Sequence, residues 1–261
     1  MSIVLADYEA ERIAFGALFK KDCKERILLY RGISGSGKTT LLSYCAENLV
    51  PKDVKFIPIE LRESSVSFAE VFYRSTQYLS WNNLTNFTKQ VAQMEGTPYA
   101  NVDKNWLAGI NNRISVVMQV ENPKDRAQRS VELTHAWFED LKAYKQTILM
   151  LFDTYEKGNT DMKEWISGPL LSRVAHAQNV RVVVAGQDIP DKKNIEWGNC
   201  CSAHDLYGVK EAKHWMPVVK AMKRKFGPEV KDPESWLAGI CHYVQGNPSA
   251  IMQVIENLPR E

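Results

Sequence analysis

Short apolar runs divide the chain into predicted strands. Residues 147–153 contain an uninterrupted apolar run that ends in a carboxylate, and residues 180–186 form a second run rich in valine. Such runs are typical of central strands in a parallel sheet, because both faces of those strands are buried. Three more strands are expected at residues 27–30, 54–60 and 204–209. Pro58 lacks the N–H that a central ladder needs, so we expect its strand at a sheet edge.

Apolar residues recur at helical spacing between these runs. The spacing predicts helices over residues 8–19, 41–49, 64–81, 84–94, 106–120, 131–144 and 161–178. Gly168 and Pro169 are expected to divide the last of these helices. Residues 123–129 are polar and are expected to form a loop, and helix 131–144 is expected to cover the sheet. The alternation of strands and helices favours an α/β fold.

The first strand is followed by a loop with the pattern Gly, four residues, then Gly-Lys-Thr. Gly35 and Gly37 can take positive φ and let several N–H groups turn toward one phosphate chain at the positive end of the following helix. Lys38 would reach the β- and γ-phosphates, and the Thr39 hydroxyl would hold Mg²⁺. The alternative is a Gly/Ser turn beside a surface lysine. The predicted phosphate-binding residues are Gly32, Ile33, Ser34, Gly35, Ser36, Gly37, Lys38, Thr39 and Thr40.

Polar residues follow the two long apolar runs. Asp153 ends the run at 147–153, which would place it beside the phosphate-binding loop and let it hold Mg²⁺ through water. Glu156 is then positioned to orient or activate an attacking water. Gln187 follows the run at 180–186 and could hydrogen-bond the γ-phosphate or that water. The alternatives are a helix cap for Asp153 and an ordinary loop residue for Gln187.

Composition changes this picture little. The 261 residues are 44% hydrophobic and 25% charged with a net charge of +2, as expected for an ordinary globular protein. The five cysteines form no CxxC pair, which favours reduced thiols in the cytoplasm. Cys200, Cys201 and His204 could suggest a metal site, but a structural role is favoured because no second ligand pair follows. No signal peptide or transmembrane helix is evident.

The C-terminal part is predicted to be helical and locally basic. Asp232 and Pro233 form an N-cap with proline at the first helical position, and Gly246 ends that helix. Seven cations are opposed by two glutamates in residues 210–231, which predicts a solvated helical face, with a nucleic-acid surface as the alternative. The seven are Lys210, Lys213, Lys220, Lys223, Arg224, Lys225 and Lys231.

The segment Gly246-Asn247-Pro248 resembles the Gly-x-Pro motif of STAND-class signal-transduction ATPases, which are related to the AAA and origin-recognition ATPases. Three further pieces match in order: the Gly-Lys-Thr loop, the helix at 133–138 before residues 152–156, and residues 183–186. The resemblance covers almost the whole chain. The ordered set is more specific than the loop alone, which many families share.

This resemblance implies a P-loop NTPase fold, with a five-stranded parallel sheet in the order 5-1-4-3-2 flanked by helices. Residues 1–209 would form the nucleotide-binding domain, and residues 210–261 a helical lid in which Pro248 packs near the adenine or sugar. The chain departs from the family at Gln187, where many relatives carry arginine. It also stops after the Gly-x-Pro helix, so sensing and output are expected on a protein partner, in a homo-oligomer or beyond this sequence.

Three functions are compatible with these residues. The first is an ATP-binding, Mg²⁺-dependent ATPase that acts as a slow molecular switch in signalling or defence. The second is a DNA-associated AAA-like assembly factor, and the third is a scaffold that binds ATP without hydrolysing it. ATP is favoured over GTP because the sequence has no Asn/Thr-Lys-x-Asp motif to bond the guanine edge. Tyr8 or Ile13 could contact the adenine, although core packing is the favoured role for both.

Overall fold

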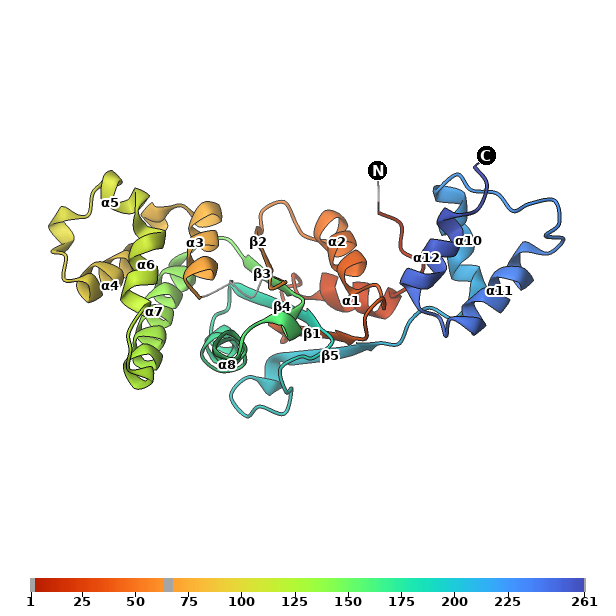
Figure 1. The fold of residues 1–261 in the computed structure, drawn as a ribbon. Helices are drawn as coiled ribbons and strands as arrows, with labels where there is room; N and C mark the ends of the chain where they lie inside the picture. Colours follow the sequence, from red (N-terminus) through yellow and green to blue (C-terminus); the bar gives the residue numbers. More distant parts are fainter. Residues whose placement is uncertain (1–2, 63–67, 261) are drawn as a thin grey trace.

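A five-stranded parallel sheet forms the centre of the structure. The computed structural model describes residues 3–62 and 68–260. The strands lie in the order β2-β3-β4-β1-β5 and all neighbours pair in parallel (Figure 1), which confirms the predicted fold and the edge position of Pro58. The strands are β1 (Ile27–Gly32), β2 (Lys55–Glu60), β3 (Ile148–Asp153), β4 (Val180–Gly186) and β5 (Cys201–Leu206).

The last strand starts earlier than expected. The prediction placed it at residues 204–209, whereas β5 runs from Cys201 to Leu206. Its first five residues are only half-buried, because β5 is an edge strand. A strand of this kind carries no apolar run that would mark its start in the sequence.

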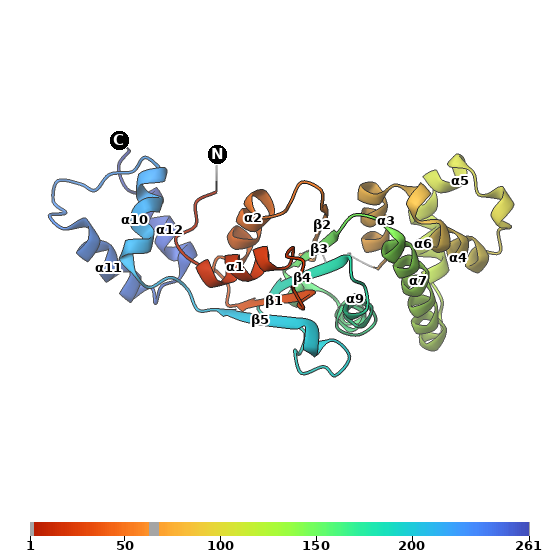
Figure 2. The same cartoon turned by 180° about the vertical axis from the view of Figure 1, so that it is seen from behind.

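Helices cover both faces of the sheet (Figures 1 and 2). The strand residues alternate between the two cores that result. Leu28 and Tyr30 of β1 join the core under α1 (Glu9–Ala17) and α2 (Lys38–Asn48). Ile27 and Leu29 join the opposite core, which includes residues of α8 (Thr160–Trp165) and α9 (Leu171–Ala175). Between α8 and α9 a π-helical turn, Ile166–Leu170, contains Pro169, so Gly168 and Pro169 widen the helix there instead of breaking it.

A helical lobe lies between β2 and β3 in the sequence and at one end of the molecule in Figures 1 and 2. Its helices are α3 (Phe68–Leu79), α4 (Thr85–Glu95), α5 (Lys104–Ala108), α6 (Ile110–Met118) and α7 (Pro123–Ala143). The predicted helix 106–120 is therefore two helices separated at Gly109. Residues 64–67 of the helix predicted from residue 64 lie outside the described residues.

Helix α7 differs from its prediction in two respects. It begins at Pro123, so the expectation of a loop at 123–129 is wrong. The Asn122 side chain accepts a hydrogen bond from the N–H of Lys124 at 3.0 Å, and proline occupies the first helical position. The main helical neighbours of α7 are α4 and α6, so it belongs to the lobe more than to the cover of the sheet.

Three helices follow β5 at the opposite end of the molecule: α10 (Ala212–Ala221), α11 (Pro233–Tyr243) and α12 (Pro248–Glu256) (Figure 1). The Asp232 carboxylate caps α11 by accepting from the N–H of Ser235 at 3.1 Å, as the sequence predicted. Asn247 caps α12 in the same way, accepting from the N–H of Ala250 at 3.2 Å. None of the helices in the described part of the chain combines the length and apolar character needed to cross a lipid bilayer.

Candidate functional site

The loop between β1 and α2 has the geometry that its glycines allow. Gly35 has φ of 78° and Gly37 has φ of 85°, and α2 starts directly after Gly37. Residues with a Cβ rarely adopt these angles. The N–H groups in the first turn of α2 have no partner within the helix, as at every helix start. The loop and this turn therefore form a surface suited to an anion.

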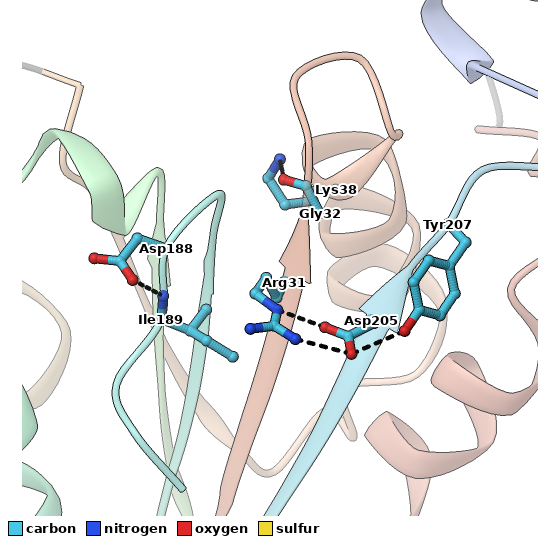
Figure 3. Close-up of polar contacts among 7 residues, drawn as sticks. All are labelled: Arg31, Gly32, Lys38, Asp188, Ile189, Asp205 and Tyr207. Atoms are coloured by element: carbon cyan, nitrogen blue, oxygen red, sulfur yellow. Dashed lines mark hydrogen bonds and ion pairs between the residues drawn. The ribbon is translucent and has the colours of Figure 1, made fainter. Parts of the chain in front are cut away.

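The Lys38 ammonium lies over the same loop. It donates to the carbonyl oxygen of Gly32 at 2.7 Å (Figure 3) and to that of Ile33 at 3.0 Å. Burial lowers the pKa of Lys38, and the nearby carboxylates of Glu156 and Asp153 oppose that effect. The cation is thus held at the loop and faces two carboxylates from the end of β3 and the turn after it.

Thr39 and Asp153 join α2 to the end of β3. The Thr39 hydroxyl donates to Asp153 Oδ2 at 2.8 Å, while Oδ1 accepts from the N–H of Thr154 at 2.8 Å. Asp153 is only 7% exposed, and its hydrogen bond from Thr39 directs the carboxylate toward the loop. A hydroxyl and a carboxylate oxygen are the protein ligands that Mg²⁺ uses together with phosphate oxygens and waters. These two residues therefore fit Mg²⁺.

The described residues hold no group of three or more His, Cys, Asp or Glu side chains arranged for a metal. Cys200, Cys201 and His204, which all lie in the described part of the chain, form no such group. It is also compatible with Mg²⁺, which dehydrates reluctantly and is usually bound through one or two carboxylates plus substrate phosphates.

Glu156 and Gln187 are brought together from two strand ends. Glu156 lies in the 3-10 turn Tyr155–Lys157 after β3, and Gln187 follows β4. The backbone N–H of Gln187 donates to Glu156 Oε2 at 2.8 Å, and its side-chain Nε2 donates to Oε1 at 3.2 Å. Burial raises the pKa of Glu156, but these hydrogen bonds and the charge of Lys38 outweigh it, so the pKa lies below its usual range. Glu156 is therefore held as a carboxylate.

A cavity of about 650 Å³ opens between the loop, the strand ends and the C-terminal helices. Of the predicted site residues, it is lined by Ser34, Gly35, Gly37, Lys38, Thr39, Thr40, Asp153, Glu156, Gln187 and Pro248. Gly32, Ile33 and Ser36 belong to the loop but are not part of this lining, and the Ile33 side chain is 70% exposed. The Ser36 Oγ is buried without a hydrogen-bond partner in the described chain.

The start of α12 contacts the loop directly. The N–H of Ser249 donates to the carbonyl oxygen of Gly35 at 3.0 Å, and Asn247 Nδ2 donates to that of Ser34 at 3.3 Å. A Cβ added to Gly37 would lie 3.5 Å from the Cβ of Pro248. The Gly-x-Pro segment thus lies directly against the loop. The sequence reasoning named Pro248 alone, although Asn247 makes the polar contact.

The cavity also has residues that sequence reasoning missed or placed differently. Tyr8 lines it and donates its hydroxyl to the carbonyl oxygen of Ser36, whereas Ile13 is 61% exposed and takes no part. Trp215 and Met252 add apolar surface from α10 and α12. Arg62, which follows β2, lines the cavity too. No motif marks these residues, since only the folded chain brings them together.

The contact between Gly35 and Asn247 predicts a specific loss of stability. A Cβ at Gly35 would lie 2.7 Å from Asn247 Oδ1, whereas a Cβ at Gly96, with a similar φ of 81°, would meet nothing within 4 Å. Gly96→Ala is expected to cost about 1–2 kcal/mol of unfolding free energy through backbone strain alone. Gly35→Ala is expected to cost at least about 1 kcal/mol more, because it also overpacks the contact. Denaturant titration of both variants measures the difference.

The same pair of substitutions in an Asn247→Ala background supplies the control. Without the amide, the cost of Gly35→Ala should fall to that of Gly96→Ala. An unchanged excess cost in that background would show that the Asn247 contact is not its source.

The sequence matches no protein-family model and no curated protein. Solved structures do resemble the chain. A Walker-type ATPase of Pyrococcus abyssi has a TM-score of 0.50 at 14% identity, covering 97% of this chain and 67% of that one. Cdc6p of Pyrobaculum aerophilum has a TM-score of 0.54 at 13% identity, covering 94% of this chain and 57% of that one. The chain thus spans roughly two thirds or less of these proteins, and it has the fold of P-loop ATPases.

Proposed function

We propose that the chain binds ATP with Mg²⁺ in this cavity and hydrolyses it to ADP and phosphate, acting as a nucleotide-controlled switch. The observation that carries the proposal is the meeting of four groups at one edge of the sheet: the glycine loop, Lys38, the hydrogen-bonded pair Thr39 and Asp153, and Glu156. Together they cover phosphate binding, metal binding and water activation, which are the requirements of phosphoryl transfer.

Phosphate binding is assigned to the loop and Lys38. The N–H groups of the loop and of the first turn of α2 would surround the phosphate chain. Lys38 would exchange the carbonyl oxygens of Gly32 and Ile33 for β- and γ-phosphate oxygens. Thr39 and Asp153 would hold Mg²⁺, which when bound neutralises charge on the phosphates.

Glu156 is proposed as the base. The oxygen of an attacking water bonds to the γ-phosphorus, and the bond from that phosphorus to the β,γ-bridging oxygen breaks. The electron pair leaves on ADP, and the proton of the water passes to Glu156. A carboxylate whose pKa is held below its usual range is ready to orient that water. Gln187 is proposed to position Glu156 through its two hydrogen bonds.

The apolar part of the cavity is proposed for the nucleoside. Tyr8, Trp215, Pro248 and Met252 line it, and their chemistry suits an aromatic base. Adenine is preferred because the sequence lacks the guanine-reading motif.

Residues 1–209 are proposed as the nucleotide-binding domain and residues 210–261 as its lid. The contacts of Asn247 and Ser249 with the loop support coupling between the two. Through that coupling the bound nucleotide would act on the lid.

The STAND-class resemblance supports an output in signalling or defence, delivered through a protein partner or a homo-oligomer. The cysteines that the structure describes are free, in keeping with a reducing cytoplasmic compartment. The DNA-associated alternative has less support. The helical face predicted for the basic stretch 210–231 is wrong, because α10 ends at Ala221 and carries only Lys213 and Lys220 of the seven cations. Lys213 pairs with Glu211 at 2.5 Å and Arg224 donates to the carbonyl oxygen of Leu258 at 2.9 Å, so two of these cations are engaged within the chain.

Phosphate release from Mg²⁺–ATP tests the proposal. We expect turnover by the parent chain and a loss of at least about 100-fold in Glu156→Gln, while that variant still binds ATP, because only the base is removed. Lys38→Ala is expected to lose ATP binding itself, measured by fluorescent-nucleotide titration. If both the parent and Glu156→Gln bind ATP but neither releases phosphate, the chain is a scaffold that binds ATP without hydrolysing it. Unchanged ATP affinity in Lys38→Ala would count decisively against the site.

The hydrogen bonds from Gln187 predict a shift in pH dependence. Because the pKa of Glu156 is lowered, the parent should keep its kcat down to a lower pH than an ordinary glutamate would allow. Gln187→Leu removes one donor, so the pKa should rise and kcat should begin to fall at a higher pH. Gln128→Leu is the matched control, since Gln128 donates to Glu132 at 2.9 Å on the surface of α7. If kcat falls at the same low pH in both variants, the role of Gln187 is contradicted.

A further inference from the structure

The charged residues that line the cavity include more carboxylates than cations. Among the described lining residues, the cations are Lys38 and Arg62, and they face three carboxylates: Asp153, Glu156 and Glu256. Gln187 at the end of β4 is neutral. Phosphoryl transfer spreads negative charge over the γ-phosphate oxygens, so a site with Lys38 as its sole protein cation would be poorly balanced. Arg62 is the remaining positive group at this cavity.

The backbone that carries Arg62 is anchored beside Asp153. Strand β2 pairs with β3 so that Glu60 lies opposite Asp153, and the N–H of Leu61 donates to the carbonyl oxygen of Asp153 at 3.0 Å. The Leu61 side chain is fully buried. Arg62 therefore leaves the sheet at a fixed point next to the metal-binding pair, with its side chain on the cavity wall.

Among residues 3–62 and 68–260, the guanidinium of Arg62 is only weakly engaged. Its Nε lies 2.5 Å from Glu60 Oε1, and the two side chains are 59% and 52% exposed. An ion pair this exposed contributes about 0–1 kcal/mol, so a phosphate group can replace the carboxylate at little cost. The planar fork of arginine also suits two phosphate oxygens at once.

Arg31 is a useful contrast. It too lies near a strand end, but it reaches across to β5 and binds Asp205 through two hydrogen bonds, from Nε to Oδ1 at 2.6 Å and from NH2 to Oδ2 at 3.1 Å (Figure 3). The Tyr207 hydroxyl donates to the same carboxylate at 3.1 Å. Arg31 is not among the residues that line the cavity. The Arg31 guanidinium is therefore paired with Asp205 on β5.

We propose that Arg62 is a catalytic residue supplied by the chain itself, which donates hydrogen bonds to the γ-phosphate oxygens as hydrolysis proceeds. This inference rests on the proposed ATPase function. While the water oxygen bonds to the γ-phosphorus and the bond to the bridging oxygen breaks, Arg62 stabilises the charge on the transferring group. Arg62 transfers no proton in this step, and the proton of the water goes to Glu156 as before.

Steady-state kinetics of Arg62→Ala, Arg62→Lys and Arg31→Ala test the inference. Arg62→Ala should lower kcat by at least about 10-fold, since arginines that contact the transferring phosphoryl group are worth large factors in kcat. Its KM for ATP should change much less, because the contact strengthens only as charge develops. Arg62→Lys should recover only part of kcat, since lysine lacks the fork. Arg31→Ala should match the parent.

Two further readouts separate the possible failures. Free guanidinium ion should raise the turnover of Arg62→Ala and leave that of Arg31→Ala unchanged, an effect that a purely structural arginine would not produce. A parent that releases phosphate while Arg62→Ala turns over equally fast overturns this inference alone. A parent that binds no ATP overturns the proposed function and this inference together. If the parent binds ATP without turnover, an equal affinity of parent and Arg62→Ala for ADP with aluminium fluoride overturns the role of Arg62.

Discussion

The hydrogen bond between Thr39 and Asp153 is the contact on which the rest of the site depends. It joins the first turn of α2 to the end of β3. It can form because all strands are parallel, so that β1, β2, β3 and β4 end at the same edge of the sheet. Lys38 and the glycine loop follow β1, Arg62 follows β2, Glu156 follows β3 and Gln187 follows β4. One topological constraint thus gathers groups that are far apart in the sequence.

The C-terminal helices add a second layer to this arrangement. The loop that would hold the phosphates also offers its carbonyl oxygens at Ser34 and Gly35 to Asn247 and Ser249. A change in the loop that turns these carbonyls therefore alters the hydrogen bonds at the start of α12. Because Asn247 also caps α12, the helix and the loop share one side chain. This gives the proposed switch a physical route from phosphate to lid.

The sheet and the loop were predictable because local patterns specify them. Apolar runs mark β3 and β4, and the spacing of Gly-Lys-Thr after β1 marks the loop. The helical lobe was less predictable. Residues 124–129 are polar because they lie on the N-terminal turns of α7 and are largely solvent-exposed, so their composition resembles that of a loop. Asn122 followed by Pro123 is a signal for the start of a helix. The loop prediction rested instead on the polar composition of the segment.

The site residues that were missed share a different cause. Asn247 is 213 residues away from Ser34, and Arg62 follows a strand with no motif around it. Their contacts arise from tertiary packing, which no local spacing encodes. Gln187 is an intermediate case, since its place after β4 was predicted but its hydrogen bonds to Glu156 depend on the juxtaposition of two strand ends.

The most direct test of this account is the affinity of the chain for ATP with Mg²⁺ and with a chelator, measured by calorimetry on the parent and on Asp153→Asn. If Thr39 and Asp153 hold the metal beside the phosphates, removing Mg²⁺ should weaken binding to the parent by at least about 10-fold, and much less in the variant. An affinity of the parent that is the same with and without Mg²⁺ would contradict the assignment of this strand edge as a metal–nucleotide site.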